Sequence, residues 1–376
     1  MRLDGITVLD LTQLLPGAYA TQLLADMGAE VVKVEPPDGD SLREVSVLTP
    51  ESGVFEGLNR GKRSVVLDLK REAGQWAIQE LAADADAVIT GYRSGVMERL
   101  GADYDTLRQE NETLVYCSLS GYGESSPYRD RPGHDLTFTG IAGLLDLSRQ
   151  SRAERPTLPP FSVADMAGGL FAAFAVSSSL LARERDGDGT YLDISILDVL
   201  LTFGQSRAPA TLAGDDPGPP GPFTGRFPCY NIYETADGRY VTLAALEPKF
   251  WHQFCEVVDR PDLRERHRSD DPAVRDVLRE ELVDLFATKT CEEWLETCAG
   301  EGTTLAPVNT LAEALADRHV ADRSMVVDGR LGLPARAEPP VDPATERPPE
   351  LGEHTRAVLE AAGVAADEID EIVEET

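Results

Sequence analysis

The chain has 376 residues, a length that fits two domains better than a single core. Its 66 acidic residues against 35 basic ones give a formal net charge of −31, which argues against nucleic-acid binding because a phosphate backbone attracts clusters of basic side chains. No apolar run reaches the roughly 18 residues of a membrane span, and no basic start precedes an apolar segment, so we expect a cytoplasmic protein without a membrane span or secretory signal.

The basic residues are strongly biased toward arginine: thirty of the 35 are arginine and five are lysine. Acidic excess with few lysines predicts adaptation to high salt, where self-repulsion is screened and carboxylates keep the surface hydrated; an ordinary acidic cytoplasmic protein is the alternative. The five cysteines form no C-x-x-C pair, and none of the five histidines pairs with a cysteine at ligand spacing. We therefore expect buried free thiols and no metal site.

The first 35 residues carry the pattern of a parallel-sheet unit. A β-rich run, "ITVLDL" at 6–11, leads through a loop at Pro16 and Gly17 to a helical run that stops at Gly28. The run "EVVKVE" at 30–35 follows as a second strand. Such β-loop-α-β units build parallel sheets.

The alternation continues to about residue 125. Strands are predicted at 63–69, 86–92 and 113–123, with helices at 72–85 and 95–101 between them. We therefore predict an α/β fold with a doubly wound parallel sheet. Ligands of such sheets bind at the carboxyl ends of the strands, so the loops of interest here are those after Leu11, Glu35, Thr90 and Ser120.

Beyond that sheet the sequence predicts a long helix and a smaller domain. Residues 161–185 form an apolar run rich in small residues, expected as a helix buried in the fold or in a subunit interface. A hairpin that turns at Asp237 and Gly238 opens a smaller α+β domain, after a Pro- and Gly-dense stretch expected to be a linker. The expected boundaries are 1–200 for the large domain, 201–226 for the linker and 227–310 for the smaller domain.

Three familiar motifs are absent from the sequence. The opening unit ends at Glu35, where dinucleotide-binding folds carry a ribose-binding acid, but its loop "LLPGAYA" has one glycine instead of G-x-G-x-x-G, which disfavours NAD. No G-x-x-x-x-G-K-[ST] loop and no G-x-S-x-G elbow occur, which disfavours a P-loop nucleotidase and a serine hydrolase.

Two basic loops stand out in a chain that otherwise avoids positive charge. An anionic ligand such as a phosphate is the functional interpretation, because arginine and lysine bind anions; a solvated loop paired with local acids is the alternative. One loop precedes a predicted strand and the other lies beside the end of a strand; their residues are Arg60, Lys62, Arg63 and Lys70, then Tyr92, Arg93 and Arg99.

Titratable residues at two predicted helix starts are candidate acid–base groups. His134 and Asp135 follow a proline and a glycine and precede an apolar run, so His134 is either a catalytic base or a polar residue at a helix start. Asp165 opens the long apolar segment. It either caps a helix or acts in catalysis, with Gly168 and Gly169 allowing a substrate to approach closely.

Seven ordered segments resemble the family III CoA-transferases, a superfamily that also contains the α-methylacyl-CoA racemases. The resemblance spans nearly the whole chain and rests on "LLPGAYATQLLADMGAEVVKVEPP", "NRGKRSVVLDLK", "YRSGVMERLG", "GYGESSPYRDRPGHD", "ADMAGG", "YETADGRYVTLAALEPKF" and "APVNTLAEAL". It implies a Rossmann-like large domain with a smaller α+β domain, and two chains interlocked as a homodimer. It also implies that a C-terminal segment, 311–376, returns to pack on the large domain.

The resemblance further implies that coenzyme A lies over the carboxyl edge of the sheet, as part of a thioester substrate and not as a separate cofactor. Where some racemases carry an arginine after the second strand, this chain has Pro36, a departure at the nucleotide end. The positions that match family CoA contacts are Leu67, Asp68, Leu69, Lys70, Gly91, Tyr92, Arg93, Arg99, Gly133, Asp135, Leu136 and Thr137.

The same resemblance distinguishes two activities. Asp165 matches an aspartate that is the nucleophile of the transferases, forming anhydride and aspartyl-CoA thioester intermediates, and one of two bases in the racemases. His134 matches the other base in a racemase G-H-D motif, Glu247 matches an acid that supports that histidine, and Tyr230 matches a tyrosine near the aspartate. We therefore predict an isomerase that epimerises 2-methylacyl-CoA thioesters. A CoA-transferase is the alternative, and a non-catalytic CoA-binding relative is the third hypothesis.

Inversion at the α-carbon of a thioester needs one base to remove the proton and a protonated group on the opposite face to return it. Imidazole titrates near neutrality, which suits His134. Asp165 must carry a proton for half of the cycle, so we expect an apolar pocket to raise its pKa. Backbone N–H groups at a glycine-rich turn after Asp165 are expected to stabilise the enolate.

Overall fold

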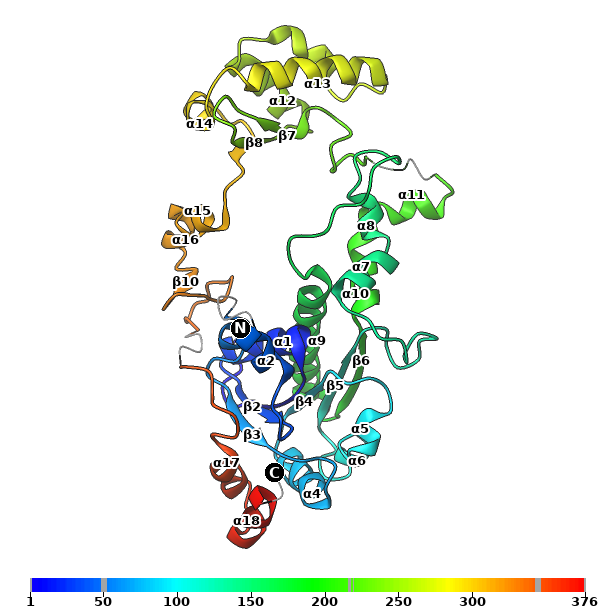
Figure 1. Cartoon of the computed structure of the whole chain (residues 1–376), viewed down its shortest axis with the longest axis vertical. Helices are drawn as coiled ribbons and strands as arrows, with labels where there is room; N and C mark the ends of the chain where they lie inside the picture. The colour runs from blue at the N-terminus through cyan, green and yellow to red at the C-terminus, as the bar shows by residue number, and fades with distance from the viewer. Residues whose placement is uncertain (1, 49–52, 216–217, 219, 342–345, 375–376) are drawn as a thin grey trace. The chain divides into compact units, whose positions relative to one another are not determined.

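The computed structural model divides into two compact units (Figure 1) and describes residues 2–48, 53–215, 218, 220–341 and 346–374. Unit 1 comprises Met1–Ala142, Pro159–Ser206 and His319–Thr376, and unit 2 comprises Gly143–Leu158 and Arg207–Arg318. The expected domains differ from these units in four places. The segment 143–158 groups with unit 2 and not with the large domain, and 311–318 groups with unit 2 and not with the return segment. The expected linker is divided, because 201–206 groups with unit 1 and 207–226 with unit 2.

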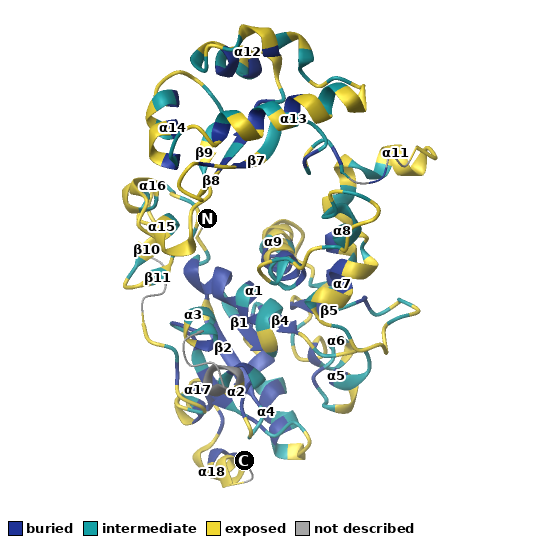
Figure 2. Ribbon diagram, turned by 45° about the horizontal axis from the view of Figure 1, so that its top comes forward, coloured by how far each residue is buried: buried dark blue, intermediate teal, exposed yellow. Residues whose placement is uncertain are grey.

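The core of unit 1 is a six-stranded sheet in which every paired neighbour is parallel. Its strand order is β3-β2-β1-β4-β5-β6, the order of a Rossmann fold, so the predicted doubly wound α/β architecture is confirmed. Because the sheet is covered on both faces, most residues of its strands are buried (Figure 2), and only the edge strand β6 alternates between exposed and less exposed residues along its first four positions. The strands are β1 Thr7–Leu11, β2 Glu30–Glu35, β3 Arg63–Val66, β4 Ala87–Thr90, β5 Val115–Ser120 and β6 Thr190–Ser195.

Two helices on one face of the sheet, α1 Leu14–Asp26 and α9 Val163–Asp186, pack closely against each other. A glycine permits the contact, because a Cβ atom on Gly169 would lie 2.4 Å from the carbonyl oxygen of Pro16. Of the described helices, α9 is the one long and apolar enough to cross a membrane, but 44% of its apolar window is buried, and core helices of globular proteins share these properties.

The opposite face is covered by helices from distant parts of the chain. Side chains of α4, α6, α17 and α18 share one hydrophobic core with β1, β2 and β3. The remaining bounds of unit 1 are α2 Ser41–Leu48, α3 Val54–Leu58, α4 Glu72–Ala83, α5 Val96–Arg99, α6 Tyr104–Leu107, α7 Asp135–Ile141, α10 Ile196–Phe203, α17 Thr355–Ala361, α18 Ala366–Glu374, β10 Val326–Val327 and β11 Arg330–Leu331.

The C-terminal segment closes the edge of the sheet at β3. The backbone N–H of Ser64 donates to Nδ1 of His354 at 3.2 Å, and the N–H of His354 donates to the carbonyl of Ser64 at 2.9 Å. The N–H of Val66 donates to the hydroxyl of Thr355 at 3.0 Å. Side chains thus supply hydrogen-bond partners that a further strand would otherwise provide.

Unit 2 is an antiparallel three-stranded sheet backed by helices, around the aromatic residues Trp251, Phe254, Phe286 and Trp294. The predicted hairpin is confirmed, and Gly238 occupies its turn with φ of 73°. The elements are β7 Tyr230–Glu234, β8 Tyr240–Ala244, β9 Leu305–Pro307, α8 Leu144–Leu147, α11 Ala208–Leu212, α12 Pro248–Val257, α13 Pro272–Phe286, α14 Cys291–Cys298 and α15 Leu311–Leu315, with α16 Arg318–Asp322 at the junction with unit 1.

All five cysteines are buried and unpaired, as predicted. Burial raises the pKa of the Cys117 thiol to about 12, so this side chain is an inert core residue. Among the described residues, no group of three or more histidine, cysteine or acidic side chains is arranged to hold a metal ion.

Candidate active site

Two adjoining cavities lie at the carboxyl ends of the strands of unit 1. One, of about 240 Å³, is lined by His134 and Asp165, and the other, of about 850 Å³, is lined by the segment 67–70 and Arg99. The cavities share Gln13 and Tyr92, whose side chains are joined by a hydrogen bond of 2.8 Å from Nε2 to Oη. The site therefore occupies the loops after β1, β2, β4 and β5 that the sequence singled out.

The smaller cavity, here called the catalytic cavity, brings together the two predicted bases. His134 is the N-terminal flanking residue of α7, and its carbonyl accepts the N–H groups of Thr137 and Phe138 at 2.7 and 3.2 Å. Asp165 is the third residue of α9 and is half-buried. Three basic side chains also line this cavity, from Arg93, Arg129 and Arg131.

Asp165 has the electrostatics that the two-base hypothesis requires. Burial, reinforced by the neighbouring carboxylate of Asp135, raises the pKa of Asp165 to about 6 from an ordinary value of 3.8. The start of a helix favours an ionised carboxylate, so desolvation outweighs the helix dipole here. The side chain can exchange a proton near neutral pH, which an exposed aspartate does far less readily.

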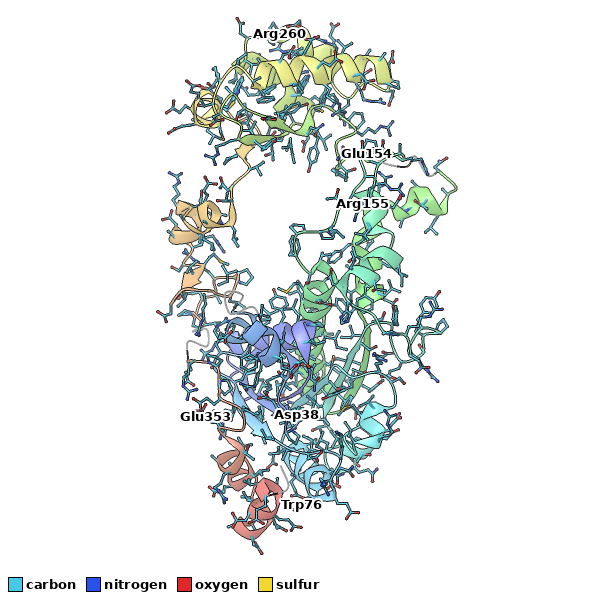
Figure 3. The ribbon with its side chains drawn as sticks, viewed as in Figure 1. Asp38, Trp76, Glu154, Arg155, Arg260 and Glu353 are labelled. Carbon is cyan, nitrogen blue, oxygen red and sulfur yellow. The ribbon has the colours of Figure 1, made fainter. Side chains whose placement is uncertain are left out.

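The larger cavity, here called the nucleotide cavity, is lined by six of the twelve residues predicted to contact coenzyme A: Leu67, Asp68, Leu69, Lys70, Tyr92 and Arg99. Lys70 and Arg99 supply its positive charge. Its acidic members are Glu35 at the end of β2, Asp38 in the loop after β2 (labelled in Figure 3) and Asp68 after β3. Glu35 is already engaged, because Arg43 donates two hydrogen bonds of 2.7 Å to its carboxylate.

The other predicted CoA contacts divide into two groups. Gly91, Arg93 and Gly133 line the catalytic cavity together with Tyr92. Asp135, Leu136 and Thr137 are not among the described residues that line either cavity, and Leu136 and Thr137 are exposed on α7.

Of the four residues in the first basic cluster, Lys70, after β3, lines the nucleotide cavity, whereas Arg60, Lys62 and Arg63 line neither cavity, so the expectation of an anionic ligand was wrong for these three. Lys62 is buried and donates to Asp10 Oδ2 at 3.1 Å, and Arg60 pairs with Asp26. Arg63 pairs with Glu30 on the neighbouring strand at 2.6 Å. Their positive charge neutralises acids distant in sequence, which a local pattern does not reveal.

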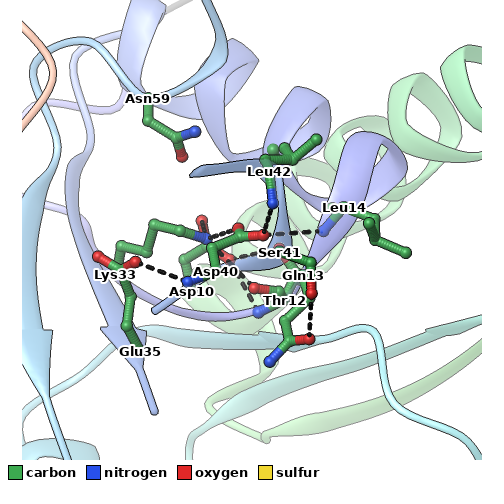
Figure 4. A network of polar contacts seen from close by, with 12 residues as sticks. Asp10, Thr12, Gln13, Leu14, Lys33, Glu35, Asp40, Ser41, Leu42 and Asn59 are labelled. Atoms are coloured by element: carbon green, nitrogen blue, oxygen red, sulfur yellow. Dashed lines mark hydrogen bonds and ion pairs between the residues drawn. The ribbon is translucent and has the colours of Figure 1, made fainter. Parts of the chain in front are cut away.

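A buried ionic network, defined here by Asp10, Lys33, Asp40 and Lys62, was not predicted from the sequence. Figure 4 shows Asp10, Lys33 and Asp40. Lys33 Nζ is 2.6 Å from Asp40 Oδ2 and 3.8 Å from Asp10 Oδ2, and all four side chains are buried. Burial alone would raise the pKa of Asp10, but the two ammonium groups and two hydroxyl donors lower it to about 2. Burial, with the like charge of Lys33, lowers the pKa of Lys62 to about 8.

The network fixes the loop that forms a wall of the catalytic cavity. Lys33 donates to the carbonyl of Thr12 at 3.2 Å, and Asp40 accepts the N–H of Leu14 at 3.2 Å. Leu14 is held with φ of 64°, a left-handed conformation that a leucine adopts only when its surroundings enforce it. The sequence offered one signal, since two of the five lysines, Lys33 and Lys62, stand within or beside apolar strand runs.

Gly168 and Gly169 do not form a turn that could stabilise an enolate, so that expectation was wrong. Both lie inside α9, where backbone N–H groups are committed to the helix. Their role is packing: a Cβ atom on Gly168 would lie 2.8 Å from Ile196, and Gly169 contacts α1. Gly133 likewise makes room, because a Cβ atom there would lie 2.5 Å from the ring of Phe138.

The remaining two predicted catalytic residues, Glu247 and Tyr230, belong to unit 2. Glu247 is exposed at the N-terminal end of α12, with Pro248 as the first helical residue. Tyr230 begins β7 and is half-buried, with its ring edge-on to Phe223 at 6.0 Å between centroids.

Comparison with known proteins gives one consistent family. The model of CoA-transferase family III matches residues 3–355. The succinyl-CoA:mesaconate CoA-transferase of Haloarcula hispanica is 33% identical, with 96% of each chain covered. The alpha-methylacyl-CoA racemase of Homo sapiens is 32% identical, with 98% of this chain and 95% of the relative covered. A CAIB/BAIF family protein from Brucella suis has a similar structure, with a TM-score of 0.83, 29% identity, and 96% of this chain and 98% of that chain covered.

Proposed function

The chain belongs to CoA-transferase family III, and on that premise we propose that it is an isomerase that epimerises 2-methylacyl-CoA thioesters by two-base proton transfer. The observation that supports this choice is one cavity lined by both His134 and Asp165, with the pKa of Asp165 raised to about 6 by burial and by Asp135. Relatives named as racemases and as CoA-transferases match at nearly equal identity, so the site chemistry carries the choice between them.

The proposed reaction removes a proton from one face of the α-carbon and adds a different proton to the opposite face. One base removes the α-proton, and the C–H electron pair delocalises onto the thioester oxygen as an enolate. The other group, already protonated, delivers its proton to the opposite face and becomes the base of the reverse reaction. His134 and Asp165 exchange these roles with the direction of turnover, and each positioned proton transfer contributes roughly 10²–10⁴-fold.

The substrate is proposed to span both cavities. Lys70 and Arg99 would hold phosphate groups of coenzyme A in the nucleotide cavity, because guanidinium and ammonium groups bind phosphate through charge-assisted hydrogen bonds. The thioester end would pass Gln13 and Tyr92 into the catalytic cavity. Arg93, Arg129 and Arg131 there would supply positive potential where the enolate charge develops.

Residues of unit 2 and a second chain complete the proposal. Glu247 would support His134, and Tyr230 would lie near Asp165, from the same or another copy of the chain. We propose that the protein is cytoplasmic and forms a homodimer. The dimer is supported by an apolar side of α9 that is exposed in the single chain; its large residues are Leu170, Phe171, Phe174 and Leu181. Patches of this kind on a helix commonly mark a protein interface.

A CoA-transferase is the second candidate, favoured by relatives of that name in Haloarcula hispanica and other organisms. In that reaction Asp165 would attack the thioester carbonyl and form an acyl anhydride as the CoA thiolate leaves. The thiolate would then attack the aspartyl carbonyl, which releases the acid and leaves an aspartyl-CoA thioester. Because the site and substrate class are shared, the two reactions differ in whether His134 is required.

Hydrogen exchange tests the proposal directly. The purified protein is incubated with a 2-methylacyl-CoA in D₂O at high salt, and deuterium at C2 is followed by mass spectrometry. We expect exchange that is lost in His134→Ala and retained in His252→Ala, a control histidine exposed on α12. Absence of exchange in the wild type, with CoA ester formed from added succinate, would instead establish a transferase.

A further inference from the structure

Helix α9 begins without a cap of its own. Ser162 occupies the capping position, yet its side chain makes no capping hydrogen bond. The free N–H groups of the first turn are instead satisfied from another element. Asp135 Oδ1 accepts the N–H of Ala164 at 2.6 Å and the N–H of Asp165 at 3.2 Å. These are the second and third helical positions, which a local cap normally serves.

We propose that Asp135 is a positioning residue that sets the spacing of the two bases, a role that rests on the proposed isomerase function. Asp135 follows His134 directly at the start of α7. The carboxylate of Asp135 accepts hydrogen bonds from the first turn of α9, including one from the N–H of Asp165 itself. One side chain thus joins the segments that carry the two bases.

Contacts made by the rest of α7 hold this connection between His134, Asp135 and α9 in place. The carbonyl of His134 is held by two N–H groups of the first turn of α7. Phe138, one turn along, is buried against Gly121 and Gly133, where a Cβ atom would lie 2.6 and 2.5 Å from its ring, and its ring centroid is 5.3 Å from that of Tyr122. The backbone of His134 therefore cannot shift without moving Asp135, and α9 moves with Asp135.

The carboxylate of Asp135 also acts on Asp165 through its negative charge. A negative group hydrogen-bonded to the backbone of Asp165 opposes a second negative charge there, so Asp135 adds to burial in raising the pKa of Asp165. The ionisable side chains that share the cavity with Asp165 are His134, Tyr92, Tyr122, Arg93, Arg129 and Arg131. Positive charge would lower the pKa of a carboxyl group, so the arginines do not account for the raised pKa of Asp165, and Asp135 is the acidic neighbour that adds to burial.

Two substitutions separate geometry from charge. Asp135→Asn keeps an oxygen that can accept both N–H groups and removes the charge, so we expect near-normal exchange at its pH optimum and a pH profile displaced to lower pH. Asp135→Ala removes both, and we expect exchange to fall about 10–100-fold with little change in KM, because a misplacement of about 1 Å costs that much. Asp103→Ala is the matched control, since Asp103 caps α6 through the N–H of Thr106 at 3.1 Å and does not line the catalytic cavity.

The pKa of Asp165 is measured separately, by titrating its ¹³C-carboxyl NMR signal, assigned by its absence in Asp165→Asn. A lower pKa in Asp135→Asn, with activity rescued relative to Asp135→Ala, supports the proposal. Unchanged pH profiles and pKa values, or equal losses in both variants, would overturn it and leave Asp135 as an ordinary helix cap. A wild-type protein without exchange refutes the isomerase function instead, and the NMR titration still reports whether Asp135 acts on Asp165.

Discussion

The pH dependence of epimerisation should report the raised pKa of Asp165. An increase from 3.8 to about 6 raises the ratio of protonated to ionised carboxyl by about 150-fold at any given pH. The active enzyme carries one proton on the pair formed by His134 and Asp165, so the rate should pass through a maximum between two apparent pKa values that belong to the pair. We expect one limb of the profile near pH 6, about two units above the position that an exposed aspartate would give.

The assay is kcat/KM for each epimer separately, from pH 4.5 to 8.5 at constant high salt. Both epimers must give the same profile, because the ratio of their kcat/KM values is the equilibrium constant, and epimerisation neither releases nor takes up protons. Circular dichroism at each pH shows that the protein stays folded. Asp165→Asn should lose activity by about 10²–10⁴-fold. A limb near pH 4 with none near pH 6 would refute the claim that burial tunes Asp165, as would a limb near pH 6 that persists in the residual activity of Asp165→Asn.

Four further predictions follow from packing and charge. Lys33→Met removes the ammonium group 2.6 Å from the buried carboxylate of Asp40 and should lower the free energy of unfolding by about 3–5 kcal/mol in denaturant titrations, whereas Lys249→Met at an exposed position of α12 should be nearly neutral. Gly169→Ala places a Cβ atom against the carbonyl of Pro16 and should cost about 1–3 kcal/mol by thermal unfolding, whereas Gly204→Ala meets open space. Arg99→Gln should raise KM for acyl-CoA about tenfold with kcat unchanged. The melting temperature should rise with KCl, because the net charge of −31 repels itself at low ionic strength.

Each of these has a result that would contradict it. Equal stability of the two lysine variants would mean that Lys33 is dispensable in the buried network, and equal melting of the two glycine variants would mean that α1 and α9 separate freely. A kcat loss in Arg99→Gln without a KM change would move Arg99 from substrate binding to the chemical step. A melting temperature that is flat or falls between low and molar KCl would remove the argument for adaptation to high salt.

The fold was predictable because its signals are local. Apolar runs such as those of β1 and β2, bounded by glycine and proline, identify strands of a parallel sheet, and the order of strands and helices then places the ligand loops. Asp165 and His134 were found because each stands at a boundary between a loop and a helix. The resemblance to a known family then assigned them roles as a pair of catalytic bases.

The errors share one cause, which is that sequence spacing does not reveal partners far along the chain. In the sequence Arg60 and Lys62 resemble a ligand-binding loop, but in the structure they form ion pairs with Asp26 and Asp10. Gly168 and Gly169 resemble a turn until α1 is seen packed on them. Asp135 was expected to contact coenzyme A, and its bonds to Ala164 and Asp165 cross about 30 residues of sequence.

The raised pKa of Asp165 does not by itself choose between the two reactions. With a pKa of about 6, roughly nine-tenths of the carboxyl is ionised at pH 7, enough to attack a thioester carbonyl as a nucleophile, and one-tenth is protonated, enough to serve as an acid. The carbonyl carbon and the α-carbon are adjacent atoms, so a small change in substrate placement converts one use of Asp165 into the other. What an isomerase needs in addition is a second proton-transfer group on the opposite face, and a transferase has no use for one there. His134, linked to Asp165 through Asp135, is therefore the residue whose removal separates the two functions: His134→Ala should abolish α-proton exchange by an isomerase and should leave CoA transfer by a transferase largely intact.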